Sequence, residues 1–258
     1  MDSLYNAWQM TCLTIAESRD PAWKRNRDVY YMLEHVPGEY AKIYLDLVIA
    51  SGLSFQEIQT YTTMVDRIGD AQCQPFPCHS EILQSSTTCL RYLWHAIEIV
   101  NRLESSIQTG IIPTLVEVGG GYGGLAIAVN YILQLRKKEG KLNYKIVDLT
   151  NVQKLQAYYT SQFTLNCIDL EFVDSKQFGA NINTSNIFII SNYCIAEMGE
   201  ANRQNYMNAL FYKKEVIGGY LQWNSGASTD CLSRFRLDIK EEHPKTGPDN
   251  KTVNFYSL

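Results

Sequence analysis

Residues 116–126 read VEVGGGYGGLA, and this stretch decides the fold. A short apolar run at 114–118 leads into the glycines, which is typical of a buried strand, and an apolar helical pattern follows at 125–135. Glycines between a strand and a helix let the backbone turn tightly and approach a ligand without an intervening Cβ atom. The start of the helix adds free N–H groups and the positive end of the helix dipole. The stretch therefore predicts a nucleotide-binding strand–turn–helix unit.

A carboxylate ends the next predicted strand. That strand covers 144–148 and closes on Asp148, where an acid can accept hydrogen bonds from both hydroxyls of a ribose. The spacing Gly119-x-Gly121-x-x-Gly124 satisfies the pattern of NAD(P) enzymes. Enzymes that use S-adenosylmethionine (SAM) favour an acid two residues before the first glycine, and Glu117 stands there. The local motif is compatible with both classes of enzyme, and also with a glycine turn that only shapes the backbone.

Predicted strands and helices alternate beyond residue 110. Strands are predicted at 114–118, 144–148, 170–173, 186–190 and 219–223, with a last one at 252–256. Helices are predicted between them at 125–135, 151–163 and 203–212. This alternation predicts an α/β fold with a parallel sheet covered by helices on both faces.

The preceding residues show helical patterns instead. An amphipathic helix at 40–48 ends at Ser51-Gly52, and a second helix opens at Ser54 with Glu57 in the capping-box position. A proline-containing loop at 69–80 leads to a third helix at 86–103. The sequence thus predicts two parts. Residues 1–110 would be a helical region on the side where the substrate that accepts the transferred group binds, and this region could also make dimer contacts. Residues 111–258 would be a Rossmann-like catalytic domain that binds the cofactor.

Polar residues follow the fourth predicted strand directly, as Ser191, Asn192 and Tyr193. Ligands of open α/β sheets bind beyond the carboxyl ends of the strands, so these residues are expected where a reacting group and its acceptor meet. The alternative is a polar loop that starts the next helix, because Ser and Asn are common at helix starts.

Several sequence motifs, and their order along the chain, resemble the sugar O-methyltransferase family of class I SAM-dependent enzymes. The motifs are VEVGGGYGG (116–124), IVDL (146–149), SNYCIAEM (191–198), YMLEHV (31–36), STTCLRY (86–92) and the closing EEHP (241–244) with Asn250. The resemblance covers about residues 25–256. It departs from the family at Thr150, where proline is usual, and at Cys194-Ile195-Ala196, where the family tends to have Ala-Phe-Ser.

This resemblance implies a SAM-dependent O-methyltransferase that methylates a sugar hydroxyl of a glycan or glycoside. The alternatives are an NAD(P)-dependent oxidoreductase and a module that binds an adenosine ligand without catalysis. The expected cofactor-binding residues are Glu117, Gly119, Gly121, Tyr122, Asp148, Leu149, Asp174, Ser175, Ser191 and Asn192.

Methylation of a weakly acidic hydroxyl calls for a positioned proton acceptor. Glu197 is the preferred candidate because it lies one helical turn beyond the residues that follow the fourth strand. His243, Tyr193 and His79 are further candidates for the catalytic group. His243 is distant in sequence, and only a fold-back of the tail that the sequence does not predict would bring it to the site. No compact cluster of acids stands in the sequence, so catalysis is expected to need no metal.

Composition limits the partners. The 258 residues include 23 basic and 27 acidic residues, a formal net charge of −4, which argues against a general nucleic-acid binder. No window approaches the roughly 18 apolar residues of a membrane span, and no secretory signal opens the chain. The seven scattered cysteines are expected to be reduced thiols. We therefore expect a cytoplasmic enzyme with a sugar or glycan acceptor, with a homodimer as an option.

Overall fold

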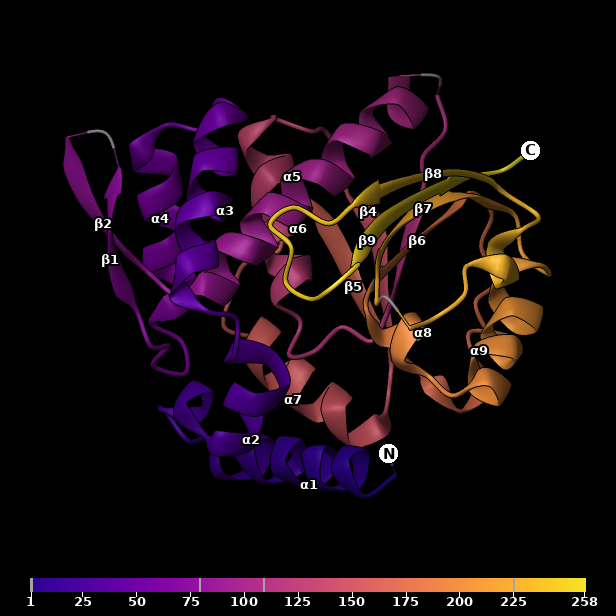
Figure 1. Ribbon diagram of the computed structural model, residues 1–258, viewed down its shortest axis with the longest axis horizontal. Helices are drawn as coiled ribbons and strands as arrows, with labels where there is room; N and C mark the ends of the chain where they lie inside the picture. The colour runs from indigo at the N-terminus through magenta and orange to yellow at the C-terminus, as the bar shows by residue number, and fades with distance from the viewer. Residues whose placement is uncertain (1, 79, 109, 225) are drawn as a thin grey trace. The chain divides into compact units, whose positions relative to one another are not determined.

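The computed structural model describes residues 2–78, 80–108, 110–224 and 226–258 (Figure 1). The chain forms two compact units. The first comprises Met1–Asn101, Gly121–Lys138 and Asn151–Thr164, and the second comprises Arg102–Gly120, Glu139–Thr150 and Leu165–Leu258. The sequence predicted one boundary between two parts, near residue 110. In the structure, the later segments Gly121–Lys138 and Asn151–Thr164 belong to the same unit as the N-terminal residues.

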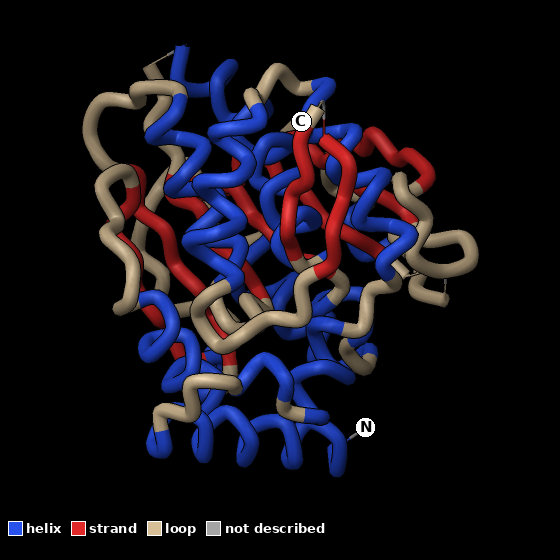
Figure 2. Tube along the Cα trace, turned by 90° about the vertical axis from the view of Figure 1, so that its left-hand side faces the viewer, coloured by secondary structure: helices blue, strands red, loops and turns tan. Residues whose placement is uncertain are grey.

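The first unit is mainly helical; helices are blue and strands red in Figure 2. Its elements are α1 (Asp2–Ser18), η1 (Trp23–Arg25), α2 (Arg27–Val29), η2 (Tyr30–Glu34), α3 (Gly38–Ala50), α4 (Phe55–Asp66), β1 (Gln74–Cys78), β2 (Glu81–Ser85), most of α5 (Thr87–Gln108), α6 (Gly124–Leu135) and nearly all of α7 (Thr150–Thr160). The predicted capping box is present, because Ser54 and Glu57 each bond the other's backbone N–H. The predicted stop at Ser51-Gly52 is also confirmed, with Gly52 at φ +95°.

The predicted loop at 69–80 is wrong in part, because Gln74–Cys78 form β1, which pairs antiparallel with β2 directly after this segment. Pro75 and Pro77 lie at exposed positions, whereas Phe76 and Cys78 point inward. A two-stranded hairpin can hold prolines because each strand has a free edge that needs no N–H donor. His79 lies outside the described residues.

Asp66 at the end of α4 anchors the start of α5. Its side chain is 6% exposed and accepts hydrogen bonds from the Ser86 backbone N–H (2.8 Å), the Ser86 hydroxyl (2.7 Å) and the Ser85 hydroxyl (3.1 Å). The Ser86 oxygen in turn accepts from the Cys89 N–H (3.1 Å). This arrangement satisfies N–H groups that would otherwise have no partner at the start of the helix.

We therefore expect Asp66→Ala to lower the free energy of unfolding by about 2–4 kcal/mol, because it leaves buried donors unsatisfied. Urea unfolding measures this change. Asp46→Ala is the matched control, since it removes only an exposed ion pair with Lys42 on α3, and its cost should stay below about 0.5 kcal/mol. Equal effects of the two variants would contradict the role of Asp66.

The second unit is built on a seven-stranded sheet with the order β5-β4-β3-β6-β7-β9-β8. The strands are β3 (Thr114–Val118), β4 (Leu142–Asp148), β5 (Ile168–Asp174), β6 (Ile187–Asn192), β7 (Val216–Trp223), β8 (Arg236–Glu241) and β9 (Lys251–Tyr256). The first five pair in parallel, and β9 pairs antiparallel with both β7 and β8. All six predicted strands are confirmed. β8 was not predicted, because its sequence RLDIKE is charged and largely exposed, as an edge strand tolerates.

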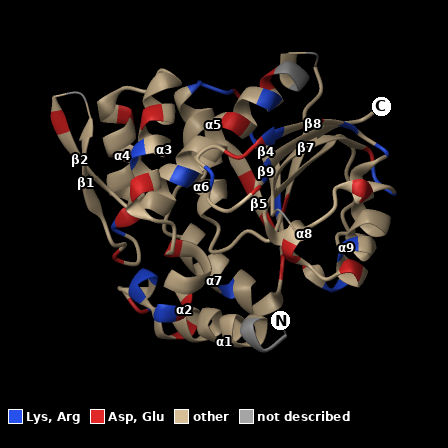
Figure 3. Cartoon of the chain, in the orientation of Figure 1, with Lys and Arg blue, Asp and Glu red and all other residues tan. Residues whose placement is uncertain are grey.

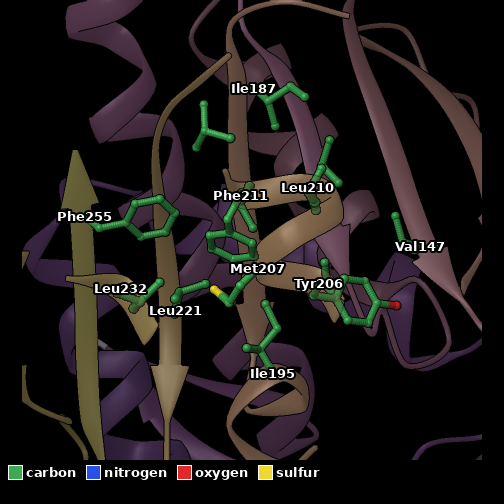
Figure 4. Packing of buried hydrophobic residues seen from close by; sticks show 14 of the residues in the cluster. Val147, Ile187, Ile195, Tyr206, Met207, Leu210, Phe211, Leu221, Leu232 and Phe255 are labelled. Atoms are coloured by element: carbon green, nitrogen blue, oxygen red, sulfur yellow. The ribbon is translucent and has the colours of Figure 1, made fainter. Parts of the chain in front are cut away.

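Short helices of this unit pack with the strands in one buried cluster (Figure 4). They are α8 (Cys194–Glu197), α9 (Glu200–Tyr206), η4 (Met207–Phe211) and η5 (Asp230–Leu232), whereas η3 (Ser175–Gln177) contains no buried residue. Met207, Leu210 and Phe211 pack in one buried cluster with the strand residues Leu221 and Phe255. Acidic and basic residues are interspersed along the elements of the chain (Figure 3).

Candidate active site

The carboxyl ends of four parallel strands gather the predicted residues at one edge of the sheet. In the strand register, Val118 lies opposite Val147, and Asp148 lies opposite Asp174. Asn192 ends β6 at the same edge. The residues that directly follow β3, β4, β5 and β6 in the second unit therefore lie at the same edge of the sheet.

The glycine turn after β3 leaves no room for side chains. A Cβ atom on Gly119, whose φ is +77°, would lie 2.4 Å from the Sγ and Cβ atoms of Cys194. A Cβ atom on Gly120 would lie 2.6 Å from a methyl carbon of Ile146. The Gly120 N–H donates to Asp148 Oδ2 at 3.0 Å. The turn therefore needs both glycines, and its backbone is tied to the end of the neighbouring strand.

Backbone donors also orient the two strand-end acids. Asp148 Oδ1 accepts from the Leu149 N–H at 2.8 Å, so each oxygen of this carboxylate accepts a backbone hydrogen bond. Asp174 accepts from the Lys176 N–H at 2.9 Å and from the Thr150 hydroxyl at 3.2 Å. The Lys176 backbone hydrogen bond is the main cause that lowers the pKa of Asp174. Ser175 follows as the first residue of η3.

Glu117 is a buried acid within β3. Its side chain is 2% exposed, and Oε2 accepts a hydrogen bond from the Tyr144 hydroxyl at 2.9 Å. Burial raises the pKa of Glu117 to about 8, the Tyr144 hydrogen bond opposes this shift, and the nearby charge of Asp148 adds to it. The protein without ligand therefore keeps this carboxyl protonated at neutral pH.

The raised pKa makes stability depend on pH. The native state holds the Glu117 proton more tightly than the unfolded chain, whose glutamates titrate near 4.5. This contribution to stability is complete below pH about 4.5 and falls as the pH rises towards 8. We expect the difference in unfolding free energy between the parent and Glu117→Gln to drop by about 2.5 kcal/mol from pH 5.5 to 7.5.

Denaturant unfolding at several pH values measures this difference. Asp169→Asn is the control, because its side chain is exposed and forms an ion pair with Lys141 at 3.1 Å. A constant difference between the parent and Glu117→Gln across this range would show that Glu117 is ionised throughout.

The end of β6 is held by Ser191. Its hydroxyl, 1% exposed, donates to the Val118 carbonyl (2.9 Å) and accepts from the Ile195 N–H (3.2 Å), so it joins the end of β3 to α8. The Oδ1 atom of Asn192 is buried, and within the described part of the chain it has no hydrogen-bond partner. Native structures rarely leave such an atom unsatisfied, so a donor from a ligand fits here.

Of the three candidate catalytic residues, Glu197 and His243 are exposed, whereas Tyr193 is partly buried. Glu197 ends α8 with an exposed side chain whose Oε1 accepts from Asn224 Nδ2 at 3.0 Å. The Tyr193 hydroxyl instead donates to the carboxylate of Glu242, the residue before the exposed His243.

The tail does fold back, which corrects the expectation that His243 lies far from the site. Because β8 runs in the same direction as β7, residues 242–250 start at the same edge of the sheet where β6 ends. The sequence motifs gave no role to Glu242, although it lies in the EEHP motif at 241–244, and none to Asn224.

Gly121 and Tyr122 belong to the first unit. Tyr122 is fully buried, and its hydroxyl donates to Glu34 Oε1 at 2.9 Å. Its ring packs edge-on against Trp23, with centroids 5.1 Å apart. The Gly121 carbonyl accepts from Gln156 Nε2 at 2.9 Å. Tyr122 thus has a packing role within its unit.

Within residues 2–78, 80–108, 110–224 and 226–258, no three His, Cys, Asp or Glu side chains form a group that could hold a metal ion. No helix in these ranges is long and apolar enough to cross a membrane.

The chain is similar to known proteins in structure but matches none of them by sequence. The sequence matches no family model and no curated protein. The structure is similar to the methyltransferase domain of a bacterial Hen1 protein, with 12% identity over 64% of this chain and 97% of that one and a TM-score of 0.48. It is similar to magnesium protoporphyrin IX methyltransferase from Synechocystis with bound S-adenosylhomocysteine (SAH), with 8% identity, coverage of 66% and 87% and a TM-score of 0.43. A glycopeptide N-methyltransferase complexed with SAH shares 12% identity, with coverage of 64% and 89% and a TM-score of 0.41.

The fold follows from the order and direction of the strands in the sheet. Five parallel strands are ordered β5-β4-β3-β6-β7, and the last strand, β9, is inserted antiparallel between β7 and β8. With helices and a glycine turn after β3, this mixed α/β architecture is the class I SAM-dependent methyltransferase fold.

Proposed function

We propose that the chain is a SAM-dependent O-methyltransferase that transfers a methyl group to a sugar hydroxyl of a glycan or glycoside. The observation that carries the proposal is the turn at Gly119 and Gly120, which is closed by a hydrogen bond to Asp148 at the carboxyl edge of the sheet. A turn without Cβ atoms next to a strand-end acid suits the adenosine part of a cofactor.

The residues present fit SAM. Asp148 would hold the ribose hydroxyls, and the turn would let the cofactor approach the backbone. Asn192 offers a buried Oδ1 acceptor that lacks a partner within the described residues, and an N–H or O–H of the cofactor would satisfy it. Glu117 lies behind the turn, where a cationic group of the cofactor would favour its ionised form.

The chemistry is an in-line displacement in which SAM supplies an electrophilic methyl group on a sulfonium. The acceptor oxygen forms a bond to the methyl carbon while the carbon–sulfur bond breaks, and the electron pair of that bond stays on sulfur. The hydroxyl proton must go to a base, and we assign Glu197 this part. Its carboxylate is exposed at the edge and is oriented by Asn224.

The sugar acceptor rests on the resemblance of the motifs at 116–124, 146–149 and 191–198 to sugar O-methyltransferases. The acidic composition supports an acceptor other than nucleic acid. Cytoplasmic location and a homodimer stay predictions from the sequence.

A nicotinamide oxidoreductase is disfavoured by the sheet. Dinucleotide-binding folds have the strand order 3-2-1-4-5-6, with the sixth strand beside the fifth. Here the antiparallel β9 occupies the place beside β7.

Calorimetric titration separates these functions. The proposal expects saturable binding of SAH and none of NAD, followed by methyl transfer from SAM to one member of a panel of glycosides and oligosaccharides. Binding of NAD without SAH would overturn the proposal, and binding of SAH without transfer to any acceptor would leave an adenosine-binding module.

A further inference from the structure

Hydrogen bonds join the two ends of the loop at 242–250 and connect the loop to Tyr193, the residue that follows β6. Its ends pair through the Glu242 N–H, which donates to the Asn250 carbonyl at 2.9 Å. Within the loop, Thr246 donates to Glu242 Oε2 from its N–H (2.9 Å) and from its hydroxyl (2.7 Å). Outside the loop, the Tyr193 hydroxyl donates to Glu242 Oε1 and lies 2.9 Å from the Thr246 hydroxyl. One carboxylate therefore connects the loop to the residue that follows β6.

Glu242 is an unusual acid for a loop. Its side chain is only 3% exposed, and within the described residues no Lys, Arg or His lies within ion-pair distance. Burial of a carboxylate is costly unless hydrogen bonds replace the lost water. Tyr193 and Thr246 supply those hydrogen bonds, so the phenol of Tyr193 and the carboxylate of Glu242 stabilise each other.

Tyr193 is also held in an uncommon backbone conformation. Its φ of +66° is rare for a residue with a Cβ atom and is typical of functional sites, where the surroundings maintain it. Its N–H donates to the Gln222 carbonyl at 3.0 Å, and its carbonyl accepts from the Glu197 N–H at 2.9 Å. Tyr193 thereby sets the start of α8, the four-residue helix that ends on Glu197.

We propose that Glu242 is a positioning residue for methyl transfer. By holding the phenol of Tyr193, it fixes α8 and places the Glu197 carboxylate against the acceptor hydroxyl. This inference rests on the proposed function. Because a shift of about 1 Å in a catalytic group can cost on the order of 100-fold in rate, loss of this contact acts on turnover. It does not act on the cofactor, since Asp148 and the glycine turn are held by other hydrogen bonds.

A double-mutant cycle of Tyr193→Phe and Glu242→Gln tests the inference. Turnover and KM are measured with the glycan acceptor that the parent methylates, SAH affinity is measured by calorimetry, and folding is followed by thermal unfolding. We expect each single variant to lower kcat about 10- to 100-fold with SAH affinity within about twofold of the parent. The double variant should be no slower than the worse single variant, because both remove one contact.

Two further variants serve as checks. Glu241→Gln is the matched control, because this neighbouring acid is exposed and pairs with Lys245, and it should keep the parent kcat. If Glu242→Gln does not fold, Tyr193→Phe and Thr246→Val carry the test, since each removes one partner and leaves the carboxylate in place.

The outcomes separate the two proposals. A parent that methylates no sugar acceptor overturns the proposed function. If the parent is active, unchanged kcat in Tyr193→Phe and Glu242→Gln overturns the positioning role. Additive losses in the double variant also overturn it, as does a loss of SAH affinity that matches the loss of kcat, because the contact would then act through the fold alone.

Discussion

Replacing Asp148 with alanine is expected to weaken SAH binding about 30- to 1000-fold. The carboxylate ends β4 beside the glycine turn, where it would accept hydrogen bonds from the two ribose hydroxyls. Loss of a charged acceptor for two hydroxyls costs about 2–4 kcal/mol, which corresponds to that range of affinity. The variant also loses the hydrogen bond from the Gly120 N–H, so part of the effect comes from a looser turn.

Calorimetric titration with SAH measures the change, and thermal unfolding confirms that the variant is folded. Asp169→Ala is the control, because it removes an exposed acid from the opposite end of the neighbouring strand β5. Gly121→Val should also weaken binding, since its φ of +54° disfavours a β-branched residue and a Cβ atom would lie 3.2 Å from Leu33. Unchanged SAH affinity in a folded Asp148→Ala variant would remove the ribose assignment.

The fold could be predicted where the sequence signals are local. The apolar run at 114–118, the glycines after it and the acid at the end of 144–148 stand in one short segment, and their structure depends mostly on their own residues. The same holds for the capping box at Ser54 and Glu57. These signals located the edge of the sheet where the site residues gather.

The elements and contacts that the sequence did not predict depend on residues far apart in the chain. β8 has a charged sequence that only its pairing with β9 makes into a strand, and the β1–β2 hairpin contains two prolines that argue against a strand. The hydrogen bond from Tyr193 to Glu242 joins residues 49 positions apart, and Asn224 reaches Glu197 across 27 positions. The periodicity of a sequence does not indicate hydrogen bonds between such distant residues. The sequence therefore showed the acidic residues but not their hydrogen-bond partners.

The second large effect is expected at Glu197. Glu197→Gln should lower turnover about 10²–10⁴-fold, the usual contribution of a positioned acid or base, and should leave SAH affinity unchanged. Glutamine keeps the shape and the Oε1 acceptor for the Asn224 amide (3.0 Å), so α8 should keep its place. Only the ability to take a proton is lost.

Turnover measured beside SAH affinity and thermal unfolding distinguishes this role from a structural one. Glu197→Gln should lose turnover while its SAH affinity and thermal unfolding stay those of the parent, because the amide cannot accept the proton of the acceptor hydroxyl. Glu200→Gln, which removes an exposed acid on α9 that pairs with Arg203 at 3.6 Å, is the control and should keep the turnover of the parent. Near-normal turnover in Glu197→Gln together with its loss in His243→Ala would instead assign the proton to the histidine that the β8–β9 hairpin carries to this edge. Unfolding of Glu197→Gln would mean that the hydrogen bond from Asn224 needs a charged acceptor, and that the acid maintains α8 rather than takes the proton.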